Sequence, residues 1–244
     1  MTGPAQRPVI VTGGASGIGR AIVARLLSAG HPVAVFDLNR PEEDADSGLL
    51  HAFELDITDH AAVAKAVSAF ADRVGAPYGL INNAGWDQAM PFIDSEPKLW
   101  DRVIDINLRG PLNVTHAVLR RMVDAGRGRV VSIASDAGRV GSSGEAVYSA
   151  AKGGIIAFMK TLAREHARQG ITFNSVCPGP TDTPLLESFD ESGRLAQALM
   201  RAIPMGRLGQ PEDFPGVVAF FLSDDAAFIT GQTISVSGGL SMHG

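Results

Sequence analysis

The chain has 244 residues, of which 45% are hydrophobic and 19% charged, so it can fill the core of one large domain or of two small ones. Its 26 acidic residues outnumber its 21 lysines and arginines, which excludes the basic surface that nucleic acid or anionic lipid requires. The single cysteine, Cys177, excludes an intrachain disulfide framework. The first eight residues lack the apolar core of a signal peptide, and no apolar run reaches membrane-spanning length. We therefore expect a cytoplasmic protein without membrane or nucleic-acid partners.

The N-terminal part of the chain predicts a βαβ unit. An apolar run at residues 8–12 predicts a strand that ends in a glycine turn, Gly13 to Gly19. A helical pattern over residues 20–29 follows, and a second strand, residues 32–36, ends on Asp37. Such a helix N-terminus presents unpaired N–H groups to a pyrophosphate, and glycines let the backbone come close to it. The spacing is G-x-x-x-G-x-G rather than G-x-G-x-x-G, and a plain turn is the alternative.

Strands and helices alternate along the rest of the chain. Residues 39–50, with a proline, a glycine and several acids, predict a loop or a short helix. Further strands are expected at residues 51–55, 79–82, 129–135, 171–176 and 232–236. Helices are expected at 59–74 with Asp59 as a possible cap, at 97–123 with an adjustment near Gly110 and Pro111, around Tyr148 and Lys152, and at 211–222. This alternation predicts an α/β fold, one doubly wound parallel sheet of about seven strands with helices on both faces.

Ligands of such sheets bind at the carboxyl ends of the strands. Polar residues and turn residues gather at those predicted ends: Gly13, Asp37, Asp56, Asn82, Ser135, Cys177 and Pro178. Tyr148 and Lys152 are four residues apart, so a helix places them on one face, a short loop after Ser135. Tyrosine ionises near pH ~10, and a lysine cation one turn away lowers that pKa, so the group could move a proton. Taken alone, this spacing is also that of two residues that merely share an amphipathic helix.

In this order and spacing, the motifs resemble those of the short-chain dehydrogenase/reductase family over essentially the full chain. The matching residues are Thr12, Gly13, Gly17, Gly19, the run Asn82-Asn-Ala-Gly85, Asn107, Ser135, Tyr148, Lys152, Pro178, Gly179 and Thr183. The resemblance implies a Rossmann-type fold in which residues 1–244 form a single NAD-binding catalytic domain, with a substrate loop at roughly 181–205. It also implies hydride transfer between the cofactor and a secondary alcohol or ketone, without a metal. The positions of the histidines also do not predict a metal site, because His51 and His60, the one pair near metal-ligand spacing, fall on different predicted elements.

The resemblance also implies a role for each site residue. Tyr148 would be the general acid/base, Ser135 would hold and polarise the substrate oxygen, and Lys152 would lower the pKa of the tyrosine and bind the nicotinamide ribose. Asn107 would support a water that passes the proton from the lysine to solvent, or it would simply be a polar residue at a kink in the long helix. The cofactor contacts implied are Gly13, Ser16, Gly17, Ile18, Gly19, Asp37, Leu38, Asp56, Ile57, Asn83, Ala84, Gly85, Tyr148, Lys152, Pro178, Gly179, Thr181 and Thr183.

Two features bear on the cofactor and the substrate. Asp37 would lie beside the adenosine ribose and disfavour a 2′-phosphate, which predicts NAD, although Arg40 nearby could pair with that phosphate instead. Within the family, the runs 133–137, 139–148 and 177–183 are most similar to members that oxidise a cyclic β-hydroxyacyl-CoA, such as 2-hydroxycyclohexanecarboxyl-CoA. The similarity is weaker over residues 185–201, so the sequence does not identify the acyl group of the substrate.

Two alternatives remain for the function: a 3-oxoacyl-acyl-carrier-protein reductase that uses NADPH, and a non-catalytic nucleotide-binding scaffold on the same fold. The family also implies a homotetramer. Small residues on the predicted Tyr148 helix would let another backbone come close there: Ala150, Ala151, Gly153, Gly154 and Ala157.

Overall fold

The structure is a computed structural model that describes residues 6–41, 48–189 and 193–242. Within these ranges, seven strands form one sheet in the order β3-β2-β1-β4-β5-β6-β7, and every pairing between neighbours is parallel. The strands are β1 (Val9–Thr12), β2 (Val33–Asp37), β3 (Leu50–Glu54), β4 (Gly79–Asn82), β5 (Gly128–Ile133), β6 (Ile171–Pro178) and β7 (Thr233–Val236). The order reverses at β1, which pairs with β2 on one side and with β4 on the other. The predicted Rossmann-type α/β fold is confirmed.

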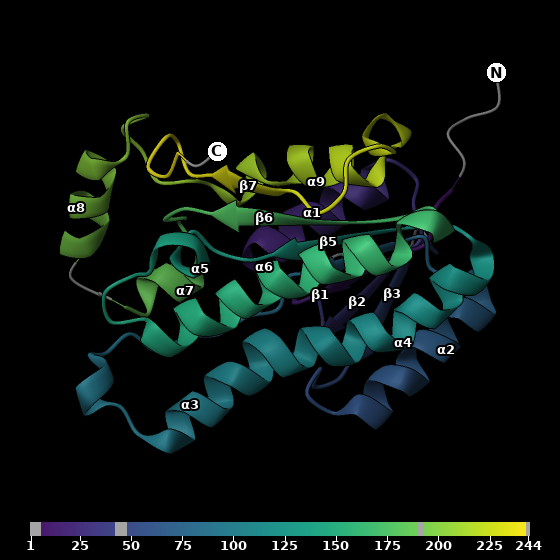
Figure 1. Cartoon of the computed structure of the whole chain (residues 1–244), viewed down its shortest axis with the longest axis horizontal. Coiled ribbons are helices and arrows are strands. Elements are labelled where there is room, and N and C mark those ends of the chain that lie inside the picture. Colours follow the sequence, from purple (N-terminus) through teal and green to yellow (C-terminus); the bar gives the residue numbers. More distant parts are fainter. Residues whose placement is uncertain (1–5, 42–47, 190–192, 243–244) are drawn as a thin grey trace.

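Helices cover both faces of this sheet (Figure 1). They are α1 (Gly17–Ser28), α2 (His60–Val74), α3 (Pro97–Ile104), α4 (Gly110–Ala125), α5 (Ala137–Val140), α6 (Ala146–His166), α7 (Pro184–Glu187), α8 (Arg194–Ala202) and α9 (Pro215–Leu222). In Figure 1, α9 lies above the sheet, whereas α4 and α6 lie in front of it and below it. The short helices α5 and α7, together with α8, lie at the end toward which the arrow of β6 points.

The two faces of the sheet explain why its strands are continuous apolar runs. Successive side chains of a strand point to opposite faces. Ile10 therefore packs with α2, α4 and α6, whereas its neighbours Val9 and Val11 pack with α1 and α9. Because helices cover both faces, both sets of side chains are buried in the central strands β1, β2 and β4, whereas the edge strands β3 and β7 are partly exposed.

Local sequence signals set several helix boundaries. The carboxylate of Asp59 accepts hydrogen bonds from the backbone N–H groups of Ala61 (2.9 Å) and Ala62 (3.0 Å), so the predicted cap of α2 is confirmed. The predicted long helix is interrupted by a π-helical turn, Asp105–Arg109, directly before α4. Pro111 lies in the first turn of α4, where its missing N–H costs little.

Other predicted boundaries shift slightly or lie outside the described residues. The third strand begins and ends one residue earlier than predicted, and the last helix divides into a 3₁₀ turn, Pro211–Asp213, and α9. The loop or short helix expected at residues 39–50 falls largely on residues 42–47, which are not described. Within the described ranges, no helix is long and apolar enough to cross a bilayer.

Candidate active site

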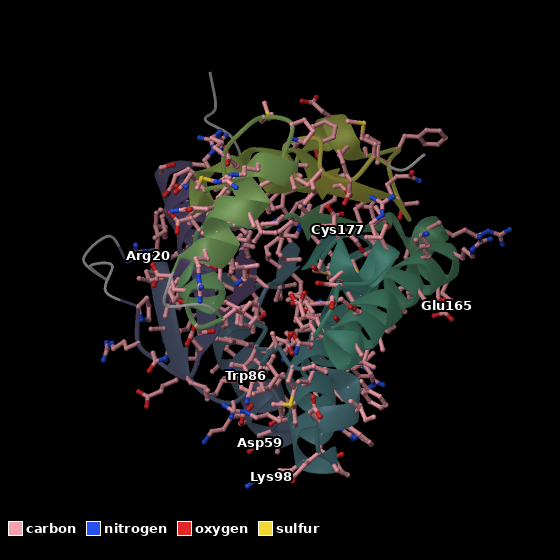
Figure 2. All side chains as sticks on the ribbon, turned by 90° about the vertical axis from the view of Figure 1, so that its left-hand side faces the viewer. Arg20, Asp59, Trp86, Lys98, Glu165 and Cys177 are labelled. Atoms are coloured by element: carbon pink, nitrogen blue, oxygen red, sulfur yellow. The ribbon has the colours of Figure 1, made fainter. Side chains whose placement is uncertain are left out.

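The loops at the carboxyl ends of the strands form the candidate site, at the edge of the sheet where strand order reverses. Figure 2 views the molecule from the left-hand side of Figure 1, so the strand ends face the reader. Trp86, after β4, and Cys177, near the end of β6, are both nearer the centre of this view than Glu165 at its right margin. Segments far apart in the sequence meet at this edge, as the hydrogen bonds between Thr12, Gly13, Asn83 and Ala84 show.

The glycine turn after β1 is locked to the turn after β4. The hydroxyl oxygen of Thr12 accepts hydrogen bonds from the backbone N–H groups of Asn83 and Ala84, both at 3.0 Å. The side-chain amide of Asn83 donates in return to the carbonyl oxygens of Thr12 (3.1 Å) and Gly13 (2.8 Å). A Cβ on Gly13 would lie 2.7 Å from the Cα of Ala84, and one on Gly19 would lie 2.0 Å from the carbonyl oxygen of Gly13. Only glycine allows this close approach.

The same glycine turn opens α1 and faces the segment after β6. Gly17, with φ of +50°, is the first residue of α1, and Ser16 is its exposed N-cap residue. A Cβ on Gly17 would lie 3.6 Å from the side chain of Thr183, so α1 and the loop before α7 border one space. A helix N-terminus beside a glycine cradle suits a pyrophosphate, so these residues fit a dinucleotide cofactor. Ile18 follows Gly17 in this first turn and packs against the core on the α1 side of the sheet.

Asp37 at the end of β2 is tied to the glycine turn. Its carboxylate accepts hydrogen bonds from the backbone N–H groups of Ala15 and Asn39, each at 3.0 Å, and the residue is half-buried. Leu38 and Arg40 beside it are exposed. The carboxylate therefore caps the turn and also places a charge at the edge of the cradle, where the sequence predicted that it would lie beside the ribose.

The remaining predicted cofactor residues lie in two further loops. After β3, Asp56 is exposed and accepts a hydrogen bond from the backbone N–H of Thr58 (2.8 Å), whereas the side chain of Ile57 is buried in the core. After β6, the hydroxyl of Thr181 donates to the carbonyl oxygen of Gly179 (2.8 Å), directly beyond Pro178. Both loops thus lie at the carboxyl edge, but the side chain of Ile57 packs in the hydrophobic core.

Three predicted catalytic residues meet where α6 passes the end of β5. Lys152 is only 4% exposed, and its Nζ donates a 3.0 Å hydrogen bond to the carbonyl oxygen of Ile133. The same Nζ lies 5.4 Å from the centre of the Tyr148 ring. Ser135, two residues beyond Ile133, accepts a hydrogen bond from the backbone N–H of Ala137 (3.1 Å), and its side chain hydrogen-bonds with Tyr148. Phenol, hydroxyl and amine are therefore gathered at one place.

The expected effect of Lys152 on Tyr148 is wrong in this structure. The pKa of Tyr148 is raised, not lowered, first by burial and then by the carboxyl groups of Glu145 and Asp87, and only the hydrogen bond with Ser135 acts in the opposite direction. Burial lowers the pKa of Lys152 to about 8, so the amine is a weaker source of positive charge than an exposed lysine. Helical spacing predicts that the two groups are neighbours but does not reveal that both are buried, and burial shifts both pKa values.

Asn107 lies in the π-helical turn and is fully buried. Its amide donates to the carbonyl oxygens of Trp86 (2.6 Å) and Val103 (2.9 Å), and its Oδ1 accepts from the Trp86 backbone N–H at 3.3 Å. A Cβ on Gly85 would lie 2.9 Å from this Oδ1 and 3.4 Å from the Nζ of Lys152. Asn107 is thus both a polar residue at a helix irregularity and a neighbour of Lys152. Single π-helical turns are frequent at functional sites.

Two acidic residues beside this group were not predicted. Asp87 is 5% exposed, and burial together with the facing Glu145 raises its pKa to about 6, while Lys152 opposes that rise. The signal available in the sequence was an acid two positions after the Asn82–Gly85 turn, in a segment that must pass the site. Cys177 is buried, and burial raises its pKa to about 11, which agrees with a packing role. The described part of the chain contains no cluster of three or more metal-ligating side chains.

The chain is similar in sequence and in structure to known oxidoreductases. The family profile described as enoyl-(acyl carrier protein) reductase matches residues 13–241. An acetoacetyl-CoA reductase of Shinella zoogloeoides is 39% identical over 239 residues, which cover 96% of this chain and 98% of that protein. A 2-dehydro-3-deoxy-L-rhamnonate dehydrogenase (NAD(+)) of a Sphingomonas strain is 38% identical over 239 residues, with 96% and 95% covered. A solved actinorhodin polyketide ketoreductase with NADPH has a TM-score of 0.89 at 34% identity and covers 96% of this chain and 97% of that one.

The chain therefore belongs to the short-chain dehydrogenase/reductase family. It is an oxidoreductase, and the family uses a nicotinamide cofactor. The names of the relatives include both NAD(+) and NADPH, so family membership does not decide between these two cofactors.

Proposed function

We propose that the protein oxidises the secondary alcohol of a β-hydroxyacyl-CoA to the ketone, with NAD as hydride acceptor. The observation that carries this proposal is the group of Ser135, Tyr148 and Lys152 at the carboxyl edge, beside a glycine cradle that fits a dinucleotide. When bound, the nicotinamide cofactor supplies the hydride chemistry. The protein supplies binding, orientation and the movement of a proton.

In this proposal, each catalytic side chain has one task. Tyr148 takes the hydroxyl proton of the alcohol during oxidation and returns it to the ketone during reduction. Ser135, which hydrogen-bonds with Tyr148, holds the same substrate oxygen. Lys152 donates a 3.0 Å hydrogen bond to the carbonyl oxygen of Ile133 and would also hold the cofactor ribose, while Asn107 keeps the turn of Trp86 against the π-helical segment. The cofactor would be held by the glycine turn, by Asp37 and by the loops that contain Asn83 and Thr181.

One relative and one resemblance of the sequence support a CoA thioester as substrate. The acetoacetyl-CoA reductase relative is named for a CoA thioester with a ketone at its β-carbon, which is the oxidised form of a β-hydroxyacyl-CoA. The runs 133–137 and 177–183 of this chain resemble those of 2-hydroxycyclohexanecarboxyl-CoA dehydrogenase, which favours a cyclic acyl group. These runs contain Ser135 and the end of β6, where we expect the acyl group to lie.

A ketoreductase that acts on acyl carrier protein with NADPH is the second candidate. The description of the matching family names acyl carrier protein, and exposed Arg40 lies three residues after Asp37, where it could pair with a 2′-phosphate.

The test is an assay of the purified protein with three thioesters: 2-hydroxycyclohexanecarboxyl-CoA, 3-hydroxybutyryl-CoA and 3-hydroxybutyryl-acyl carrier protein, each with NAD⁺ and NADP⁺. We expect kcat/KM to be highest for a CoA thioester with NAD⁺, and the cyclic acyl group to exceed the linear one. A preference for the acyl-carrier-protein thioester with NADP⁺ would establish the second candidate instead. Turnover of none of the six combinations would contradict both.

We also propose a homotetramer. In α6, Gly153 and Gly154 pack within the chain, against Gly138 and Leu108, whereas Ala150 and Ala157 are exposed. Other exposed apolar side chains are Phe220 in α9, Phe228 after it in the chain and Ile234 in the edge strand β7. Association of subunits would bury such exposed apolar groups. Light scattering that gives the mass of one chain would exclude it.

A further inference from the structure

A second group of charged side chains lies at the opposite edge of the sheet, where the strands begin. In Figure 1 this is the end from which β6 starts, away from α5, α7 and α8. A pocket of about 280 Å³ lies there, and the described residues that line it include three arginines but a single acid. Its lining includes Arg7, Tyr78, Arg127, Arg129, Gly170 and Asp224. Of these, Arg7, Tyr78 and Gly170 come one or two residues before β1, β4 and β6.

Arg129 is the buried cation of this pocket. It is the second residue of β5 and is only 7% exposed. Its Nη1 donates hydrogen bonds to the carbonyl oxygens of Gly128 (3.0 Å) and Gly170 (3.2 Å), whereas its Nε is buried with no acceptor among the described residues. No carboxylate in the described part of the chain forms an ion pair with it. Buried charges in proteins are normally paired, so this guanidinium lacks the anion that its burial calls for.

The acid of the pocket, Asp224, is already paired with Arg7. Its carboxylate accepts a 2.6 Å hydrogen bond from Nη2 of Arg7, while Nη1 donates to the Tyr78 hydroxyl (3.0 Å) and to the carbonyl oxygen of Leu222 (3.1 Å). Arg7 is the main cause that lowers the pKa of Asp224, and Arg129 adds a smaller share. The Asp224 side chain is 76% exposed, so solvent screens its attraction to Arg129. The pocket therefore keeps an excess of positive charge.

Tyr78 fixes the positions of two of the arginines. The guanidinium carbon of Arg7 lies 4.5 Å from the centre of the Tyr78 ring, and that of Arg129 lies 5.6 Å from it. The backbone N–H of Tyr78 donates to the carbonyl oxygen of Pro8, and the backbone N–H of Arg129 donates to that of Tyr78, both at 2.8 Å. The pocket is thus preformed, which lowers the cost of ordering its side chains around a ligand.

Arg127 adds a cation on the exposed side of the pocket. It lies two residues before Arg129, and its backbone N–H donates to the carbonyl oxygen of Met122 near the end of α4 (3.2 Å). Its side chain is exposed and forms no ion pair with a described carboxylate. The planar fork of a guanidinium matches the oxygens of a phosphate. Because a water molecule takes up about 30 Å³ in the liquid, the pocket also has room for a tetrahedral anion.

We propose that this pocket binds a phosphate group, held by Arg129 from inside and by Arg127 from the exposed side. The ligand is a phosphate dianion, either free or as the monoester end of a small molecule. It neutralises the buried charge of Arg129 and stabilises the folded chain, because the unfolded chain lacks the pocket. The site lies at the amino ends of the strands, whereas the candidate active site lies at their carboxyl ends, so the proposal is independent of the proposed function.

The first test is calorimetric titration of the purified chain with inorganic phosphate, at constant ionic strength in a chloride buffer. Arg127→Gln should weaken phosphate binding about tenfold, because it removes one charge-assisted hydrogen bond. Arg129→Lys, which keeps the charge but loses the fork, should also weaken it about tenfold. The control is Lys98→Gln, which removes an exposed positive charge in α3 (Figure 2) and should keep the wild-type affinity.

The variants also show where the phosphate binds. A phosphate at the glycine turn after β1 would respond to neither arginine, so equal affinity in wild type and both arginine variants would overturn the proposal. Absence of binding to wild type would overturn it as well. If circular dichroism shows that Arg129→Lys does not fold, Arg127→Gln, at an exposed position, decides the question alone.

The second test locates the site by modification with phenylglyoxal, which reacts with arginine, followed by mass spectrometry of peptides. Saturating phosphate should abolish the modification of Arg127 and leave that of Arg25, an exposed arginine of α1, unchanged. Glycerol 3-phosphate in place of inorganic phosphate distinguishes the two sources: protection by both assigns the site to a phosphate monoester, and protection by inorganic phosphate alone assigns it to the free anion. Modification of Arg127 at the same rate with and without either compound would refute the site.

Discussion

The choice between NAD and NADP is expected to depend on one charge, that of Asp37. Its carboxylate lies at the end of β2, fixed by hydrogen bonds of 3.0 Å from the backbone N–H groups of Ala15 and Asn39. This is the strand end that meets an adenosine ribose in folds of this type. We predict that Asp37→Asn, which removes the charge but keeps an acceptor oxygen of the same size, abolishes most of the preference for NAD.

The magnitude follows from the repulsion between the carboxylate and a 2′-phosphate. Unit like charges about 4 Å apart repel by about 4 kcal/mol at an effective dielectric constant of about 20. Asp37 is only half-buried, so solvent screens part of this repulsion, and we expect about 2 kcal/mol to remain, which is roughly a thirtyfold difference. The charge of Arg40, exposed three residues later, would reduce the value further if the side chain turned toward the phosphate.

The assay compares kcat/KM for NAD⁺ and NADP⁺ with one alcohol, and the dissociation constants of both cofactors without substrate. Wild type should prefer NAD⁺ about thirtyfold, and Asp37→Asn should use both within a few-fold. Glu165→Gln, with the same loss of charge far from the site, should keep the wild-type ratio. Equal use of both cofactors by wild type would refute the reasoning, as would an asparagine variant with the full preference.

Three other variants test the site. Tyr148→Phe should lower kcat about a hundredfold or more while cofactor affinity, measured by titration, stays nearly unchanged. Gly138→Ala should cost about 1–3 kcal/mol of unfolding free energy in urea, because its Cβ would lie 2.7 Å from backbone atoms of Lys152 and Gly153. For Asp87, the folded-state pKa of about 6 exceeds the reference value of 3.8, so stability is lost as pH rises through 6. The free energy of unfolding of Asp87→Asn, measured in urea, should therefore rise relative to that of wild type between pH 4 and 8, by up to about 3 kcal/mol.

The strands could be predicted because their sequence signal is local. Parallel strands that are covered on both faces are continuous apolar runs, and the run before Gly13 and the run before Asn82 are both of this kind. The cap of α2 was predictable for the same reason, because Asp59 bonds to residues two and three positions later. Each of these features depends on neighbours in sequence.

The π-helical turn at Asp105–Arg109 could not be predicted in the same way. It accompanies a contact between Asn107 and the backbone of Trp86, which is 21 residues earlier in the chain. A sequence pattern showed that the long helix must adjust near Gly110 and Pro111, but it did not show how. The form of the irregularity depends on which distant segment the helix meets.

Some features of the site could be predicted from the sequence, whereas others depend on contacts between distant segments. The carboxyl ends of parallel strands share one edge, so the fold class alone predicts that Gly13, Asp37, Asn82 and Ser135 gather there. The pKa of Tyr148 could not be obtained from its distance to Lys152 along α6. It depends on burial and on Asp87, which reaches the tyrosine from another loop. Helical spacing gives the neighbours within an element, but not the solvent exposure or the charges that other elements contribute.

Burial acts on Tyr148 and Lys152 in opposite directions, and the result bears on how the site handles protons. It raises the pKa of the phenol and lowers that of the ammonium to about 8, so in each case the neutral form is favoured. Near pH 8, Lys152 therefore exchanges a proton readily, whereas Tyr148 keeps its own. Lys152 also lies directly beside Gly85, where even a single added Cβ would come within 3.4 Å of its Nζ. Under the proposed function, we therefore expect Lys152 to be the group through which the proton of Tyr148 leaves before the tyrosine can act as a base. The side chain of Asn107 lies against the same glycine.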